Sequence, residues 1–326
     1  MVKTLNRPLA AFGNGARQVA RAWRYVLLAY AINLALTLGL AVFVQDALRS
    51  SLGSSLAGER MKANWDSFWY ASFSAGAEGV AASFRPSVSG PGAVLDALEA
   101  QLDGFAAIDA NFWPLLATYW AAWSFLSAGF VSWFVVPDRR VGFLARAAGL
   151  FGRFLPISLV GLCGYAAILG PIRSWADTLV ASRLRQVSDE RVHFAWTLGE
   201  YLFLWTLVVL VSLVIDYAKV FVARKTDASA AARVVALSFG AAVRFVARRL
   251  ASVAFLHGLI GLVGLLLMVF YVAFVPGALD ATAAAVFGTF LFGQVFVLSR
   301  MALRCLFYAS EAALVAEFAD APRTKE

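Results

Sequence analysis

The 326-residue sequence is poor in charge and in the side chains that most often bind metals or carry catalysis. Asp, Glu, Lys and Arg together make up 15% of the chain, which holds only two cysteines and two histidines. Soluble domains are about one quarter charged, so this composition excludes an ordinary water-soluble domain. Zinc takes three or four ligands, and His193 and His257 are too few to supply them. We expect no metal and no cofactor.

Recognisable catalytic motifs are also absent from the sequence. It contains no His-Glu-x-x-His, no Gly-x-Ser-x-Gly, no phosphate-binding loop and no cysteine pair at ligand spacing. Cys163 and Cys305 fall within apolar segments, so they do not indicate a disulfide framework. We therefore expect a protein that is not an enzyme.

What the sequence does have is long apolar segments. Hydrophobic residues make up 61% of the chain, and its mean hydropathy is +0.74. About 20 helical residues cross a hydrocarbon core of roughly 30 Å. Six segments meet this requirement: 25–45, 112–136, 154–172, 194–216, 250–275 and 281–306. The expected fold is all-α, a polytopic membrane bundle of six helices, the last of which continues beyond the membrane past Arg304.

The distribution of basic residues predicts how the chain is threaded. If both termini are cytoplasmic, 20 of the 28 Lys and Arg residues lie inside, in 1–24, 137–153, 217–249 and from residue 300 onward. The outer loops, 46–111 and 173–193, hold the other eight. Cytoplasmic segments carry the excess of basic residues, so we expect N-in/C-in topology with a cytoplasmic tail at 307–326. The pattern indicates a multi-pass membrane protein.

The first outer loop differs in charge from the rest of the chain. Residues 46–111 hold eight acidic and four basic side chains. We expect an acidic cap there that offers a surface to a protein partner, with a short amphipathic helix over 94–103. The pI of 9.8 then describes the cytoplasmic face, where anionic lipid is the expected partner and nucleic acid is not.

Two segments before odd-numbered spans share a pattern. In 12–21 and 239–248, Phe-Gly is followed after three residues by Arg and after three more by another Arg. An apolar stripe opposite the basic residues is typical of a helix in the membrane interface, and a weaker copy occupies 143–154. One interpretation of this repeated pattern is three hairpins, each preceded by an interfacial helix. The other is that any basic helix next to a membrane span has this pattern. The apolar stripes are Phe12, Ala16, Val19 and Trp23; Phe239, Val243, Val246 and Leu250; and Phe143, Ala147, Leu150 and Phe154.

The segment Asp216-Tyr217-Ala218-Lys219, followed by a basic amphipathic stretch, resembles a group of uncharacterised bacterial multi-pass inner-membrane proteins over residues 200–275. The resemblance implies a membrane location, and it assigns no activity or site residue.

Charged groups near span ends are the first candidates for function. Asp216 and Lys219 lie at the inner end of the fourth span and can share one helix face. We expect Asp216 either to pair with Arg300 or Arg304 of the sixth span or to anchor the helix at the interface. Polar groups within membrane segments are costly and often functional.

Deeper polar groups complete the candidate set. Glu200, about two turns into the fourth span, could bind a cation or relay protons, or it could pair with Arg173 or Arg191. Asn33, His257 and Gln294 lie within spans, where hydrogen bonds between helices account for them without a ligand.

Three functions remain open from the sequence. The preferred hypothesis is a non-enzymatic membrane protein that binds lipid or a partner subunit in the cell envelope. The alternative is a small-solute transporter or channel component, with Glu200, Asn33 and Gln294 facing a common cavity. An enzyme would require carboxylates and His193 to converge at the outer face.

Overall fold

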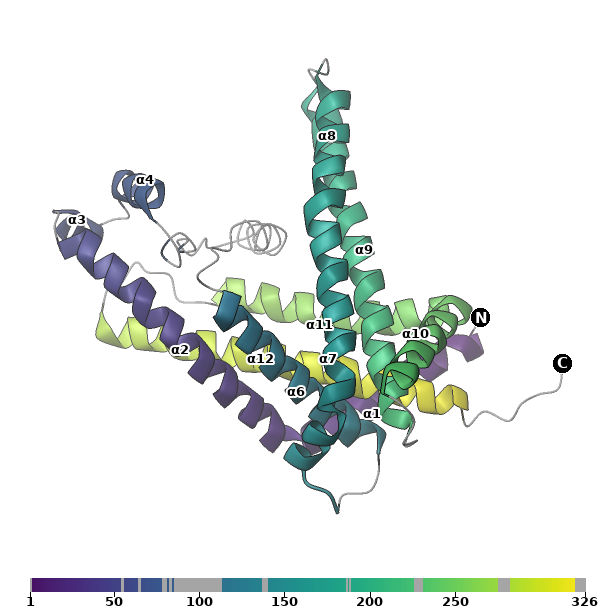
Figure 1. Cartoon of the computed structure of the whole chain (residues 1–326). Helices are drawn as coiled ribbons and strands as arrows, with labels where there is room; N and C mark the ends of the chain where they lie inside the picture. The colour runs from purple at the N-terminus through teal and green to yellow at the C-terminus, as the bar shows by residue number, and fades with distance from the viewer. Residues whose placement is uncertain are drawn as a thin grey trace. The chain divides into compact units, whose positions relative to one another are not determined.

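The computed structural model describes residues 2–53, 56–63, 66–77, 81, 84, 113–136, 140–185, 187, 189–225, 231–274 and 282–319 (Figure 1). All regular elements in these ranges are helical, which confirms the predicted all-α class. Six helices are long and apolar enough to cross a membrane, so the chain is a multi-pass integral membrane protein. The amphipathic helix expected over 94–103 lies outside the described residues.

Each predicted span overlaps a helix of the structure, and several of these helices are longer than the predicted span. The helices are α1 (Val2–Arg21), α2 (Trp23–Gly53), α3 (Ala57–Ala63), α4 (Ser67–Gly76), α6 (Trp113–Val135), α7 (Phe143–Ala167), the π-helical turn η3 (Ile168–Ile172), α8 (Arg173–Leu184), α9 (Glu190–Arg224), α10 (Ala231–Arg248), α11 (Leu250–Phe274) and α12 (Ala283–Ala319). The sixth span continues without a break to Ala319, as its apolar sequence predicted.

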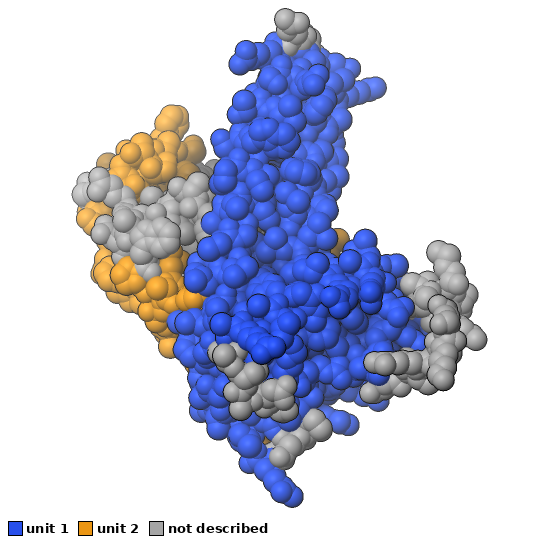
Figure 2. All heavy atoms as spheres, turned by 45° about the vertical axis from the view of Figure 1, so that its right-hand side comes forward, with its two compact units in different colours: residues 1–23, 121–262, 303–326 blue, residues 24–120, 263–302 orange. Residues whose placement is uncertain are grey.

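The chain forms two compact units (Figure 2). Unit 1 comprises residues 1–23, 121–262 and 303–326, and unit 2 comprises residues 24–120 and 263–302. Within unit 1, α9 packs against α7, α8 and α10. Phe130, Phe154 and Tyr217 are among its largest fully buried side chains.

Two of the three predicted interfacial helices are separate helices. The breaks fall at equivalent repeat positions, since Ala22 lies ten residues after Phe12 and Arg249 lies ten residues after Phe239. At each break the backbone N–H donates to two carbonyls of the preceding helix. Bonds to residues both three and four positions earlier tighten the last turn of a helix. The two copies therefore share a helix boundary as well as a sequence pattern.

The third copy differs from this arrangement. The expected boundary between an interfacial segment at 137–153 and a span at 154–172 is not a helix boundary, because α7 runs through both. Pro156 lies inside α7, and Pro171 lies in η3, from which the chain continues directly into α8. Helices in membranes tolerate proline when a local change of helical pitch satisfies the freed backbone groups. The described part of residues 173–193, which were expected to form an outer loop, is accordingly helical over most of its length.

α1 packs on the C-terminal half of α12 through small residues. Pro8, Ala11 and Gly15 form its buried face, at i, i+3 and i+7. A Cβ atom added at Gly15 would lie 2.8 Å from the Ser310 backbone nitrogen, so only glycine permits this approach. Arg7 extends over the Phe318 ring, with 4.8 Å between the guanidinium carbon and the ring centroid.

In unit 2, the described part of the first outer loop has a small core. Ala57, Trp69 and Phe73 are buried together. Asp66 caps α4 by accepting hydrogen bonds from the backbone N–H groups of the second and third helical residues. The Trp69 indole donates to the Ser51 hydroxyl of α2 at 3.1 Å. These contacts place folded structure directly after the first span.

Candidate functional site

Unit 1 contains an ion pair between α9 and α12 whose carboxylate is buried. Asp216 is 1% exposed, and its Oδ1 accepts a hydrogen bond from Arg304 Nη2 at 3.0 Å. Arg304 Nη1 lies 3.0 Å from Asp216 Oδ2, so the guanidinium faces both carboxylate oxygens, and a hydrogen bond between charged groups of this kind is stronger than a neutral one. The predicted pairing of Asp216 with the sixth span is confirmed for Arg304.

Two further side chains extend the ion pair into a cluster. Lys219 Nζ lies 3.7 Å from Asp216 Oδ1, one helical turn away on α9. The Arg304 Nε donates to the Tyr308 hydroxyl at 3.2 Å, and both cations lie over the Tyr308 ring. Cation–π contacts and a hydrogen bond supplement the ion pair, so Asp216, Lys219 and Arg304 each have more than one partner.

Glu311 is a buried acid that the sequence analysis did not single out. It is 2% exposed, and within the described part of the chain neither carboxylate oxygen has a hydrogen-bond partner. Arg304, Tyr308 and Glu311 occupy positions i, i+4 and i+7 of α12 and therefore share one helix face. The sequence already gives this spacing, but residues 307–326 were interpreted as a cytoplasmic tail and Glu311 was not considered.

This cluster joins α9 to α12; Asp216, Lys219 and Glu311 are buried in it, whereas the Arg304 side chain is 38% exposed. Its charges are Asp216 and Glu311 against Lys219 and Arg304, and its carboxylate and guanidinium groups already face each other. Breaking a buried pair leaves an uncompensated charge, which is strongly destabilising. The arrangement is suited to holding α9 and α12 in one position relative to each other along their axes.

Asn33 and Gln294 of unit 2 each accept a hydrogen bond from a tyrosine on another helix. The Tyr119 hydroxyl of α6 donates to Asn33 Oδ1 at 3.2 Å. The Tyr30 hydroxyl of α2 donates to Gln294 Oε1 at 2.8 Å. These are the interhelical hydrogen bonds expected of polar groups within spans.

The remaining polar candidates have different surroundings. The His257 ring of α11 packs at a tilt against Phe307, with ring centroids 4.7 Å apart, and its buried Nδ1 has no hydrogen-bond partner in the described ranges. The hydrogen bond expected for His257 is therefore not seen at Nδ1. Arg300 is exposed and lies over the Phe296 ring at 5.9 Å. It takes no part in the Asp216 pair.

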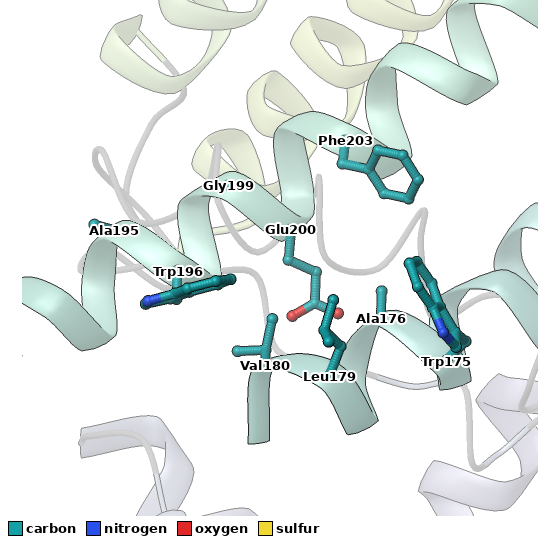
Figure 3. Close-up of a pocket in the computed structure, with 9 residues that line it drawn as sticks. All are labelled: Trp175, Ala176, Leu179, Val180, Ala195, Trp196, Gly199, Glu200 and Phe203. Atoms are coloured by element: carbon teal, nitrogen blue, oxygen red, sulfur yellow. The ribbon is translucent and has the colours of Figure 1, made fainter. Parts of the chain in front are cut away.

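Glu200 lies in a groove between α8 and α9 (Figure 3). The groove has a volume of about 450 Å³, and Glu200 is the one charged residue among those described as lining it. Its walls are apolar and aromatic, with the Trp175 and Phe203 rings 6.5 Å apart at their centroids. Glu200 Oε1 is enclosed and lacks a hydrogen-bond partner among the described residues. The lining residues are Trp175, Ala176, Leu179, Val180, Ala195, Trp196, Gly199, Glu200 and Phe203.

The neighbour of Glu200 is an acid that the sequence analysis did not consider. Asp177 of α8 and His193 of α9 line a second pocket that shares Glu200. Arg173 Nε is 3.9 Å from Asp177. No group of three His, Cys, Asp or Glu residues in the described ranges is arranged to hold a metal ion. Arg173, one of the two residues expected to pair with Glu200, lies at this 3.9 Å distance from Asp177.

A third pocket, of about 470 Å³, lies where α9 ends, between α10 and the end of α12. Five basic side chains line it, and none of the described lining residues is acidic. Three phenylalanines form apolar wall, with Phe245 in edge-to-face contact with Phe221 and Phe318. The basic residues are Arg224, Lys225, Arg244, Arg248 and Arg249. We call this site the basic pocket.

The equivalent arginines of α1 line a different kind of pocket. Arg17 and Arg21 occupy the repeat positions of Arg244 and Arg248, and their pocket also contains Glu317 of α12. An acid thus accompanies the α1 arginines. The two sequence copies differ in the charge of the α12 residues that face them.

No protein-family model, curated protein or solved structure matches this chain. The resemblance of residues 200–275 to bacterial inner-membrane proteins therefore stays a sequence-based expectation. The functional argument rests on the side chains and their geometry.

Proposed function

We propose that this chain is a non-enzymatic protein of the bacterial inner membrane that binds anionic lipid through the basic helices α1 and α10. The observation that carries the proposal is the combination of apolar and basic side chains on the exposed face of α10. One side of this helix is buried through Val234, Ser238 and Ala242. The rest exposes large apolar and basic side chains together.

The exposed side chains of α10 suit both the acyl-chain layer and the headgroup layer of a membrane interface. Leu237 and Val243 are each more than half exposed, and Arg244 and Arg248 are exposed beside them. A helix of this kind lies in the interface plane with its apolar side chains among acyl chains and its arginines at the headgroups. A basic residue near an anionic surface contributes about 1 kcal/mol to binding.

α1 supports the same proposal. Its buried face packs on α12, while Arg17 and Arg21 are exposed and Trp23, immediately after the helix break, is 54% exposed. Tryptophan is enriched at membrane–water interfaces because its ring is apolar and its N–H is polar. Two separate helices thus present the same kind of surface.

A transporter or channel component is the alternative, and one observation favours it. Glu200 faces a groove with an enclosed carboxylate oxygen. However, Asn33 and Gln294, the other members of the expected polar pathway, are occupied by tyrosine hydroxyls. Transport therefore rests on Glu200 alone, and lipid binding has the broader support.

The proposal is tested by thermal unfolding of the purified protein in mild detergent with added phosphatidylglycerol or phosphatidylcholine. A ligand that binds only the folded state raises the unfolding temperature. We expect phosphatidylglycerol to raise this temperature by several degrees more than phosphatidylcholine at equal concentration. Equal shifts would remove the basis for anionic-lipid binding.

A further inference from the structure

We infer that the basic pocket is a discrete site for one anionic phospholipid, whose headgroup phosphate binds the arginines and whose acyl chain lies against the phenylalanines. This inference rests on the proposed function and adds to it a location and a ligand class. It predicts saturable binding at one place rather than diffuse attraction along α1 and α10.

The charge of the basic pocket is the first reason. Arg224, Lys225, Arg244, Arg248 and Arg249 converge from the end of α9 and from α10, and no described lining residue is acidic. Like charges gathered in one pocket repel each other unless an anion lies among them. Basic pockets between membrane helices on the cytoplasmic side are suited to phospholipid headgroups.

The location of two of these residues strengthens the argument. Arg224 is the last residue of α9, and Lys225 caps the helix, with its N–H donating to the Val222 carbonyl. The Lys225 carbonyl accepts from Arg153 at 3.4 Å. The backbone that carries Lys225 is therefore held by both α9 and α7, and one edge of the pocket is fixed.

The apolar wall distinguishes a lipid from a soluble anion. Phe245 contacts Phe221 and Phe318 edge to face, with ring centroids 5.8 and 5.9 Å apart. Arg249 lies 4.6 Å from the centroid of the Phe318 ring and so joins the charged and aromatic parts of the pocket. A free phosphate would use only the charged part, whereas an acyl chain would also cover the aromatic wall.

The chain supplies its own control for this site. Arg17 and Arg21 are the repeat counterparts of Arg244 and Arg248, but their pocket contains Glu317. Removing either pair takes away two positive charges from a basic helix. Only the α10 pair lines a pocket that has no described acid, so only its loss is expected to weaken binding strongly.

The experiment compares R244Q/R248Q with R17Q/R21Q in the full-length protein, titrated with phosphatidylglycerol and followed by native mass spectrometry. At about 1 kcal/mol for each charge, R244Q/R248Q should weaken binding of the first lipid by at least about tenfold. R17Q/R21Q should weaken it less than about threefold. R244K/R248K, which keeps both charges, should retain most of the affinity and shows whether the positions tolerate substitution.

Each other outcome has a definite meaning. No preference of the wild-type protein for phosphatidylglycerol over phosphatidylcholine would overturn the proposed function and this site with it. A preference that both glutamine variants reduce equally, or that R244Q/R248Q leaves intact, would overturn the site alone. Displacement of the lipid by millimolar inorganic phosphate would assign the pocket to a soluble anion and would also overturn the inference.

Discussion

Asp216 and Arg304 form a two-point ion pair between α9 and α12, with both N–O distances at 3.0 Å and the carboxylate almost fully buried. Lys219 adds a second cation 3.7 Å from the same carboxylate. We expect D216N to lower the free energy of unfolding by about 2–3 kcal/mol, because it leaves the buried Lys219 and the partly exposed Arg304 without this acid. Equilibrium unfolding in mixed micelles measures this change.

Arg300 provides the control for that variant. It is exposed, lies on the same helix as Arg304, and contacts the Phe296 ring at a distance of 5.9 Å. We expect R300Q to change the unfolding free energy by less than about 1 kcal/mol. Equal losses in D216N and R300Q would show that the ion pair does not hold α9 to α12.

Gly15 tests the packing of α1 on α12. An added methyl group would lie 2.8 Å from the Ser310 nitrogen and 2.9 Å from its Cα, both on the backbone and unable to move aside. We expect G15A to destabilise the protein by about 1–3 kcal/mol through overpacking. Proteolysis at the start of the chain, compared before and after substitution, detects release of α1.

Gly13 of the same helix has no atom within 4 Å of an added Cβ. We expect G13A to be neutral or to stabilise the protein by up to about 1 kcal/mol, because alanine is the better helix former. If G13A and G15A released α1 equally, helix propensity rather than close packing would be responsible.

Tyr30 tests the contribution of a hydrogen bond between spans. Its hydroxyl donates to Gln294 Oε1 at 2.8 Å, and Y30F removes this donor while preserving the ring. We expect a loss of about 0.6 kcal/mol, the average for such bonds within membranes. The Y30F/Q294L double variant should lose little more than Y30F alone, and additive losses would contradict the coupling.

Substitution of Glu200 tests whether its enclosed carboxylate lowers the free energy of unfolding. Its Oε1 lacks a hydrogen-bond partner in the described part of the chain, and its groove is otherwise apolar. We expect E200M, which keeps the volume and removes the polar group, to be neutral or to raise the unfolding free energy by up to about 2 kcal/mol.

Asp177 supplies the comparison for Glu200. Its side chain is 57% exposed and lies 3.9 Å from Arg173, so D177N should cost less than about 1 kcal/mol. A loss of more than 1 kcal/mol in E200M would mean that the Glu200 carboxylate stabilises the α8–α9 pair, contrary to this interpretation.

The sequence could predict the helical class and the spans because apolar length alone identifies a membrane helix. It could also narrow the partner of Asp216 to Arg300 or Arg304, since both lie near the end of the sixth span that is predicted to be on the same side of the membrane as Asp216. The choice of Arg304 depends on which face of α12 meets α9. A single sequence shows which side chains share a face of each helix, but it does not show which faces of two helices pack against each other.

The same reason explains the residues that were missed. Glu311 lies seven residues after Arg304 and is buried. It belongs to the end of α12, which was interpreted as a tail and was therefore not expected to pack against other helices. Asp177 meets Glu200 because α8 continues from α7 through η3 and lies alongside α9 (Figure 1). The basic pocket likewise requires the end of α12, which is distant in sequence from α10.

The central claim is that the wild-type protein binds anionic lipid selectively. The most direct test is to equilibrate the purified protein with equal amounts of phosphatidylglycerol and phosphatidylcholine in mixed micelles and to quantify the lipid that remains bound after gel filtration. We expect phosphatidylglycerol to exceed phosphatidylcholine in the bound fraction by at least about fivefold, with the excess reduced at high salt as charged contacts are screened. A bound fraction of equal composition would contradict the account.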